Sequence, residues 1–302
     1  MKIMVGEGNN INRVTVITVS YFSKYILREN INSVLSKVKN VDEYIIINNS
    51  PEENIDELKS DIVKIINNVG NAGYGNAINI GIKISKNDML LIINPDIILK
   101  SFKIHDNIIN NEKYIIGGMT EDIVNGYEFP NIYSDAFNIL FGRISSKLVP
   151  SILKRKHIAI NESGPVDWIS GSLIFTNKKT IEYIGYFDEK YFLFYEEIDL
   201  CKRAYNKNIP VFITSDINYV HRIELKSSSI NVNEIKITSE VNSFKLYYNK
   251  YNSKDNTSLI MKIMKIMSYL IYYAISIIKI IFNDNVFISN KHSYYKVLSN
   301  NL

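Results

Sequence analysis

The chain has 302 residues, of which 46% are hydrophobic and 22% are charged, and its formal net charge at pH 7 is +4. These values suit one α/β domain with a helical tail, and the charge is too small to indicate binding to nucleic acid. Its single cysteine, Cys201, excludes an internal disulfide and a thiolate metal cluster. The first 13 residues hold no apolar segment of signal-peptide length, so we expect a frayed tail and a cytoplasmic protein.

The first hundred residues alternate between predicted strands and predicted helices. Val14–Ser20 is continuous and β-branched, which is typical of a buried parallel strand. The other predicted elements are strands at 44–47, 63–66 and 88–93, and helices at 24–38, 55–58 and 76–85. The alternation predicts a mainly parallel sheet with helices on both faces, within one domain over residues 1–250. Loops at the strand ends of such a sheet should meet in one crevice.

The middle of the chain is less regular. Residues 120–163 carry no clear periodicity and should connect two halves of the domain. A second set of elements runs from Val166 to His221, with strands predicted at 173–176 and 211–214.

Residues 251–302 form a predicted helical tail, of which 259–282 is the most apolar part. Only 13 residues are uncharged between Lys265 and Lys279, too few to cross a bilayer. At about 100° per residue, its polar residues fall on one stripe: Lys262, Lys265, Ser268, Tyr272, Ser276 and Lys279. This pattern is typical of a helix in a membrane interface. Packing on the main domain, or a contact between two copies in a homodimer, is the alternative.

The segment 187–203, FDEKYFLFYEEIDLCKR, contains the densest group of acids. Glu196, Glu197 and Asp199 follow an aromatic run and precede two bases. A surface helix whose charges suit the helix dipole would show the same order. In a helix, Glu196 and Asp199 share one face and Glu197 points elsewhere.

The glycine-rich segment 68–81 indicates a ligand loop of another kind. Its spacing does not fit the dinucleotide fingerprint or the P-loop, which excludes a dehydrogenase and a P-loop NTPase. Gly70 and Gly73 would let the backbone approach a nucleotide closely. The alternative is a plain glycine-rich turn before a helix.

Two further residues are candidate metal ligands. Asp96 follows an apolar strand and Pro95, which fixes the turn, and such an aspartate suits Mg²⁺ or Mn²⁺ that keeps positions open for a diphosphate. A turn cap is the alternative role for Asp96. His221 ends the second set of strands and would complete a Mn²⁺ shell, although a lone histidine is more often structural.

Taken in order, these motifs resemble the family 2 glycosyltransferases with the GT-A fold, especially the rhamnosyltransferase-like members of surface-polysaccharide pathways. The resemblance runs from about Val14 to about Ser229. Positions that match the donor side of the family are Asn48, Asn49, Gly70, Gly73, Asn94 and Asp96. Positions that match the acceptor side are Trp168, Gly171, Glu196 and Asp199. Two positions depart from the family, because Asn48 and Glu197 stand where many members carry aspartate. At Asn48 the change alters the hydrogen-bond donors that the side chain offers to the nucleotide base.

The resemblance implies an inverting transfer of a sugar, with rhamnose suggested by the branch, to an acceptor hydroxyl. The donor would be a nucleotide-diphosphate sugar, and the product would enter a bacterial-type surface polysaccharide such as O-antigen or capsule. It implies a divalent metal, Mn²⁺ or Mg²⁺, at Asp96 with His221, and Glu197 as the base. Trp168 would be a platform for a sugar ring or, equally, a buried core residue. An acceptor on a polyprenyl-diphosphate carrier, with the protein peripheral on the inner face of the cytoplasmic membrane, would fit the tail.

Two other functions fit this sequence less well. A non-catalytic GT-A-like subunit would bind a partner enzyme or a lipid-linked glycan at the membrane, and the presence of Asp96, Glu197 and His221 together argues against it. A nucleotidyltransferase needs a glycine-rich basic loop after the first strand, where this chain has SYFSK at 20–24.

Overall fold

The structure is a computed structural model, and it describes residues 13–68, 70–104, 112–120, 126–141, 163–222, 230–281 and 286–302. The tail expected at residues 1–12 and most of the irregular connection expected within 120–163 lie outside the described residues. The same holds for Val69 in the glycine-rich segment and for Phe282 at the end of the apolar segment.

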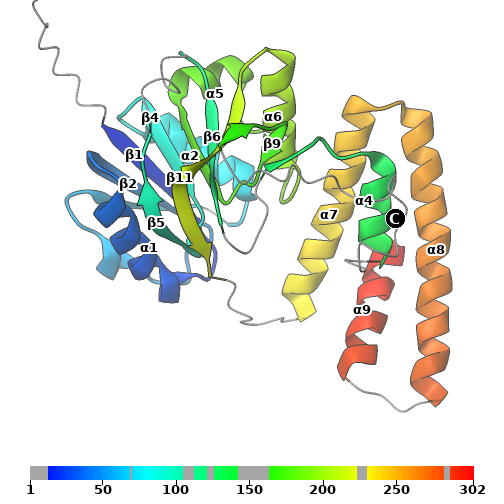
Figure 1. The fold of residues 1–302 in the computed structure, drawn as a ribbon. Coiled ribbons are helices and arrows are strands. Elements are labelled where there is room, and N and C mark those ends of the chain that lie inside the picture. Colours follow the sequence, from blue (N-terminus) through cyan, green and yellow to red (C-terminus); the bar gives the residue numbers. More distant parts are fainter. Residues whose placement is uncertain are drawn as a thin grey trace, which may run out of the picture.

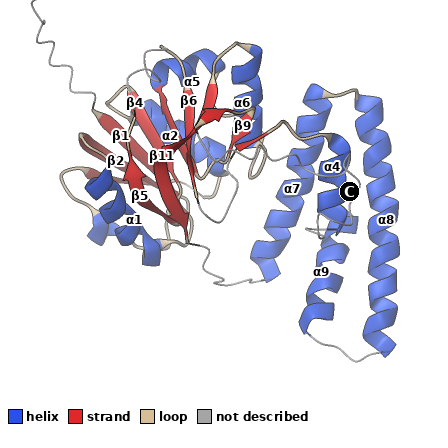
Figure 2. Ribbon diagram, viewed as in Figure 1, coloured by secondary structure: helices blue, strands red, loops and turns tan. Residues whose placement is uncertain are grey.

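A nine-stranded mixed sheet forms one half of the molecule, and a group of helices forms the other (Figures 1 and 2). The strands are β1 (Val14–Ser20), β2 (Val41–Asn48), β3 (Val63–Asn67), β4 (Met89–Ile93), β5 (Ile97–Phe102), β6 (Ile115–Met119), β7 (Gly126–Tyr127), β8 (Gly164–Pro165), β9 (Trp168–Ile169), β10 (Leu173–Asn177) and β11 (Val211–His221). The helices are α1 (Lys24–Lys37), η1 (Asp56–Leu58), α2 (Tyr74–Ile84), α4 (Ile132–Phe141), α5 (Lys178–Ile184), α6 (Glu196–Asn206), α7 (Ile230–Tyr251), α8 (Lys254–Ile281) and α9 (Val286–Asn301).

The strand order is β3-β2-β1-β4-β10-β6-β11-β5, with β8 beside β11 and a separate pair β7-β9. The first four strands are parallel, whereas β10 runs antiparallel to both of its neighbours. All seven residues of β1 are buried, and they alternate between two apolar clusters. Ile17 packs in the cluster that contains α2, and Val16 in the cluster that contains α1. Both faces are therefore covered, which is why the strand reads as a continuous apolar segment.

The mainly parallel GT-A-type sheet is confirmed, and so are the predicted strands and helices of the first hundred residues. Several elements of the sheet half were not predicted or were predicted too short. β5 begins directly after Asp96, β6 contains two glycines, and β11 extends to His221 instead of ending at Thr214. β11 pairs with both β5 and β6 at one edge of the sheet, so tertiary contacts rather than local sequence fix these strands.

Helices α7, α8 and α9 pack against one another and around α4, a helix that the irregular sequence around it did not suggest (Figure 1). The apolar tail is helical as predicted, although α8 begins at Lys254, ahead of the apolar segment. The division of the chain near residue 250 coincides with the end of α7 at Tyr251 and stays a prediction.

Part of the polar stripe of α8 packs inside the group of helices, as the packed alternative would require. Ser268 is fully buried, Ser276 Oγ lies 3.1 Å from Nε2 of His292, and Lys279 Nζ donates to Ser289 Oγ at 3.1 Å. The last two partners belong to α9, which the sequence did not reveal as a neighbour. Apolar side chains occupy the outer face of α8 instead: Leu259, Ile263, Ile266, Leu270, Tyr273, Ile277 and Ile278.

Candidate active site

A cleft of about 660 Å³ opens at the carboxyl ends of β1, β2, β3 and β4. Its wall includes Asn49 after β2, Asn71 and Gly73 after β3, and Asn94 and Asp96 after β4. The predicted convergence of these three loops on one crevice is therefore seen in the structure. Residues from two later segments, Phe192 with Leu193 and Ile235 with Lys236, close the other side.

Asp96 and His221 lie together at this cleft. Nε2 of His221 is 3.0 Å from Oδ2 of Asp96, and β11 reaches this point because its last residue pairs with Ile97 of β5. The hydrogen bond to Asp96 raises the pKa of His221. Asp96 is thus held by a histidine from a strand more than a hundred residues away in sequence.

A buried asparagine of α1 fixes the turn that carries Asp96. Nδ2 of Asn30 donates to the carbonyl oxygens of Asn94 at 3.1 Å and of Ile97 at 2.6 Å, and its Oδ1 accepts from the Tyr44 hydroxyl. Asn30 and Tyr44 are both fully buried, so this polar network is satisfied inside the core. The network therefore gives the Asp96 turn a rigid support.

The oxygen atoms at this turn suit a hard divalent cation. Within the described part of the chain, Oδ1 of Asp96 and Oδ1 of Asn94 are buried and have no hydrogen-bond partner. No group of three or more histidine, cysteine, aspartate or glutamate side chains among the described residues could hold a metal alone. The Asp96–His221 pair therefore fits a metal that shares its shell with phosphate oxygens and water.

The four donor-side residues in the earlier loops differ in where they lie. Asn49 and Gly73 line the cleft, and Nδ2 of Asn49 donates to Oδ1 of Asn71 at 3.2 Å. Asn48 is 1% exposed and holds its own loop: its Oδ1 accepts from the Ser50 backbone, and its Nδ2 donates to Asn67. Neither Asn48 nor Gly70 belongs to the described cleft wall.

Gly73 is required by the backbone at the cleft, and this gives a testable prediction. Its φ is +95°, and an added Cβ would lie 2.5 Å from the carbonyl oxygen of Phe192. We expect Gly73→Ala to destabilise the fold by roughly 1–3 kcal/mol and to weaken nucleotide binding. Gly70→Ala is the matched control, because φ is +74° there and nothing lies within 4 Å. Thermal unfolding and nucleotide titration compare the two; equal effects would refute the steric argument.

Glu197 lies on the first turn of α6, next to the cleft. An added Cβ at Gly171 would lie 3.6 Å from Cβ of Glu197, and the Gly171 carbonyl accepts at 2.9 Å from the hydroxyl of Tyr74, a cleft residue. Burial raises the pKa of Tyr74 well above its usual value, and the charges of Glu196, Glu197 and Asp96 raise it further. All three carboxylates therefore act electrostatically on the Tyr74 hydroxyl, which stays neutral.

Glu196 and Glu197 are adjacent acids in a buried setting. Glu196 is 5% exposed, and burial, followed by the neighbouring charge of Glu197, raises the pKa of Glu196 well above 4.5. Burial thus favours the protonated form of Glu196. Adjacent acids in such a buried setting are typical of catalytic sites.

Asp199 is fully buried in α6 and serves as an anchor in this structure. Its carboxylate accepts from Arg203 Nε at 2.8 Å, from Lys250 Nζ at 2.7 Å and from the Tyr251 hydroxyl at 2.8 Å. The geometry therefore favours an anchoring role for Asp199 over the acceptor-side role that the resemblance implies.

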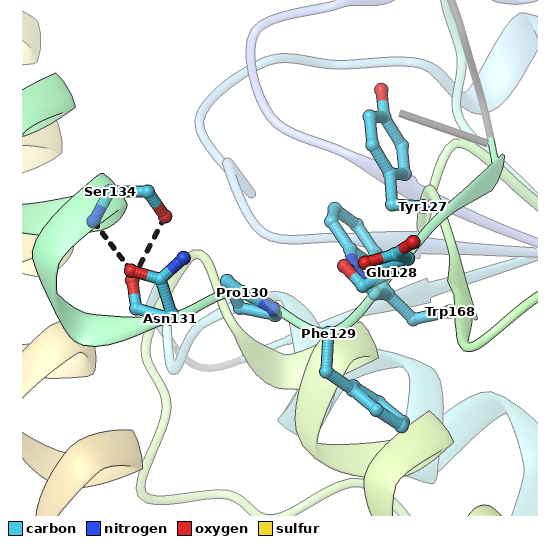
Figure 3. A pocket seen from close by; sticks show the side chains of 7 residues that line it. All are labelled: Tyr127, Glu128, Phe129, Pro130, Asn131, Ser134 and Trp168. Carbon is cyan, nitrogen blue, oxygen red and sulfur yellow. Dashed lines mark hydrogen bonds between the residues drawn. The ribbon is translucent and has the colours of Figure 1, made fainter. Parts of the chain in front are cut away.

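Trp168 lies beside a second, smaller cavity of about 210 Å³ (Figure 3). Its ring stacks on that of Tyr127, with centroids 4.3 Å apart, and its Nε1 donates to the carbonyl oxygen of Glu128 at 3.0 Å. The two cavities share none of their described lining residues, and Trp168 is only 7% exposed. The geometry therefore favours packing over a sugar platform in the main cleft.

Several cleft residues were not singled out from the sequence. Tyr21 and Phe22 follow β1 and are 41% and 48% exposed in the cleft wall, and Lys236 is the only lysine or arginine among the described lining residues. Two aromatic residues directly after a buried strand are a usable sequence signal. Lys236 had none, because only the folded position of α7 brings it there.

The sheet with its cleft beyond the strand ends defines the GT-A class of fold. The crystal structure of GalNAc-T7 with UDP, GalNAc and Mn2+ has a similar fold, with a TM-score of 0.54 and 13% identity, over 76% of this chain and 48% of that one.

Residues 15–119 match the model of the family described as "Glycosyl transferase family 2". The low-salt glycan biosynthesis hexosyltransferase Agl10 of Haloferax volcanii is 27% identical over 214 residues, which are 69% of this chain and 66% of that protein. The matched part thus spans just under two thirds of that relative. The family model thus identifies a family 2 glycosyltransferase segment at residues 15–119, and the branch within the family stays a prediction.

Proposed function

We propose that this protein is an inverting glycosyltransferase that moves a sugar from a nucleotide-diphosphate sugar to an acceptor hydroxyl. The observation that carries the proposal is the pairing of Asp96 with His221 in the strand-end cleft, with Glu197 one tyrosine away. The proposed diphosphate site in the cleft and the proposed base beside it thus lie on either side of Tyr74. Rhamnose is the sugar that the motif resemblance suggests, in assembly of a surface polysaccharide such as O-antigen or capsule.

Glu197 is the proposed base of the transfer. It would take the proton of the acceptor hydroxyl while that oxygen forms a bond to the anomeric carbon. The bond between the anomeric carbon and the phosphate oxygen breaks, and the nucleoside diphosphate leaves with its electron pair. Glu196, which keeps its own proton, would donate a hydrogen bond to a sugar or acceptor oxygen.

Asp96 and His221 are the residues that would hold a divalent cation, Mn²⁺ or Mg²⁺. Bound there, the cation would offset the negative charge that develops on the leaving diphosphate. The crystal structure of GalNAc-T7, which has a similar fold, contains UDP and Mn2+, and this supports the proposal.

The nucleotide end of the donor would lie near the loops after β1 and β2. Tyr21 and Phe22 offer exposed ring faces to a base, and Asn49 offers an amide at the same wall. Lys236 would place its ammonium group against the diphosphate from the opposite side.

We also propose that the outer face of α8 rests on a membrane surface. Ile266, Leu270 and Tyr273 are each 61% exposed, and Lys262 and Lys265 lie between the exposed apolar positions. The segment Lys254–Lys279 is also long and apolar enough to cross a membrane, with a mean hydropathy of 1.4. The 13 uncharged residues between Lys265 and Lys279 did not suggest a span. Its inner face packs on α4 and α9, so a helix lying on the surface fits the fold. A homodimer contact is the alternative.

Replacing Ile266, Leu270 and Tyr273 together by asparagine should therefore reduce binding to anionic vesicles at least about tenfold, because apolar burial contributes roughly 1.5–3 kcal/mol per side chain. Leu35→Asn with Ile84→Asn, two exposed apolar positions of the sheet half, is the matched control. Vesicle flotation measures both. Undiminished flotation of the triple variant would contradict the membrane contact, and a loss of dimer would point to a second copy.

The location that follows is peripheral, on the inner face of the cytoplasmic membrane, with a polyprenyl-diphosphate-linked glycan as acceptor. The catalytic domain would span residues 1–250 and so include almost all of α7.

A release assay tests the function. Purified protein is mixed with UDP-, dTDP- and GDP-sugars, Mn²⁺ and short acceptors. Each acceptor is either a free sugar with an open hydroxyl or a sugar linked to a polyprenyl diphosphate. Release of one nucleoside diphosphate that depends on acceptor would support the proposal. No release from any donor, together with binding of a lipid-linked glycan, would favour the non-catalytic subunit.

A further inference from the structure

The backbone immediately before Glu196 is held in a conformation that side chains rarely adopt. Phe194 and Tyr195 both have φ of 68°, in the left-handed region. Tyr195 is the residue that precedes α6, so these two residues set the direction in which the helix starts. Two consecutive left-handed residues other than glycine persist only where the surroundings hold them.

A buried hydrogen-bonded cluster holds Tyr195 in place. Its hydroxyl donates to Oδ2 of Asp135 at 2.5 Å, and the hydroxyl of Tyr248 donates to the same oxygen at 2.9 Å. Asp135 is 0% exposed. The cluster joins α4, the start of α6 and α7, and we call Asp135, Tyr195 and Tyr248 the α6 lock.

Helix α7 contacts the same segment at further points on both sides of the lock. Upstream, the Ser243 hydroxyl donates to the carbonyl oxygen of Leu193 at 2.9 Å. Downstream, Lys250 and Tyr251 donate to Asp199. The chain from Leu193 to Asp199, which contains Glu196 and Glu197, is thus bonded to α7 before and after the two glutamates.

The helices that supply these bonds lie outside the segment matched by the family model, which ends at residue 119. Helix α7 does reach the donor cleft, through Ile235 and Lys236, whereas the three lock residues are not among the described residues that line it. The direction of Glu197, in contrast, depends on a strained turn whose hydrogen-bond partners come from those helices.

We propose that Asp135, Tyr195 and Tyr248 are positioning residues, which aim Glu197 at the acceptor hydroxyl from outside the cleft. This inference rests on the proposed function of Glu197. A base displaced by about 1 Å costs on the order of 100-fold in rate, whereas donor binding at Asp96 is unaffected. The lock is thus a requirement for turnover, whereas its three residues lie outside the described lining of the donor cleft.

The test compares phenylalanine variants that each remove one buried hydroxyl. Tyr195→Phe and Tyr248→Phe break the lock. Tyr294→Phe is the matched control, because its hydroxyl donates at 2.6 Å to the Ile139 carbonyl of the same helix α4 and has no bond to α6. We expect the two lock variants to lower kcat at least about tenfold with donor KM unchanged, and the control to keep kcat.

The conservative variant Asp135→Asn keeps an acceptor oxygen for the two hydroxyls and should retain more activity than Asp135→Leu. Unchanged kcat in a folded Tyr195→Phe would overturn the proposal, and so would an equal fall in Tyr294→Phe. Both results presuppose a wild type that turns over, and an inactive wild type counts against the proposed function instead.

A second measurement needs no activity. Amide hydrogen exchange over residues 192–199 should become faster in Tyr248→Phe and stay unchanged in Tyr294→Phe. Unchanged exchange in Tyr248→Phe would overturn the lock even if no donor is ever turned over.

Discussion

Replacing Glu197 by glutamine is expected to reduce sugar transfer by about 100- to 10,000-fold, because a positioned base contributes that much to proton transfer. Glutamine has the shape of glutamate, so the packing of α6 and the fold should remain. Donor affinity should change little, since Glu197 is not among the described residues that line the cleft. Initial rates of nucleoside diphosphate release and a donor titration measure the two quantities. Wild-type turnover in the variant would remove Glu197 from its role.

Glu196→Gln is the matched control for that variant and should keep a large part of the activity. Since burial raises the pKa of Glu196, the neutral amide resembles the protonated form that burial favours. The folded state binds this proton more tightly than the unfolded state does. This stabilisation is complete below pH 4.5 and is lost as pH rises from 4.5 through the pKa of Glu196 in the folded protein. Over that rise in pH, the free energy of unfolding should fall less for Glu196→Gln than for the wild type.

The second large effect is expected at Asp96. Asp96→Asn keeps a hydrogen-bond partner for His221 but loses the charge that a divalent cation requires. Loss of a residue that only hydrogen-bonds to a metal ligand already costs about 10- to 100-fold in metal affinity. Because Asp96 would bind the metal itself, we expect at least about a 100-fold loss of Mn²⁺-dependent donor binding.

Titration of a nucleoside diphosphate with Mn²⁺ and with EDTA measures that difference for wild type and variant. Asp167→Asn is a suitable control, because Asp167 accepts from the Phe129 backbone at the other cavity. Equal affinity with and without Mn²⁺ in the wild type, or an unchanged Asp96→Asn, would contradict the metal assignment.

The donor half of the site was predictable because it depends on local sequence. Apolar strands followed by polar turns place Asn49, Gly73 and Asp96 at the same edge of the sheet, whatever the rest of the chain does. Asn48 shows the limit of this reasoning. Its neighbour Asn49 faces the cleft, whereas its own amide is used inside the loop, and one residue along an extended chain reverses the side-chain direction.

The acceptor side and the helical half were less predictable, because they depend on contacts between distant segments. Asp135 lies in a stretch without periodicity, and its role appears only when Tyr195 and Tyr248 reach it from two other helices. The outer face of α8 could not be assigned from the sequence for a similar reason, since α9 supplies partners for part of the polar stripe.

A crystal structure with Mn²⁺ and a nucleoside diphosphate, read through the anomalous signal of the metal, tests the account most directly. The account predicts one Mn²⁺ in contact with Asp96 and His221, about 2.0–2.2 Å from its ligand atoms, with the diphosphate in the strand-end cleft. A nucleotide seated instead in the Trp168 cavity, or a cleft nucleotide with no Mn²⁺ at Asp96, would contradict it.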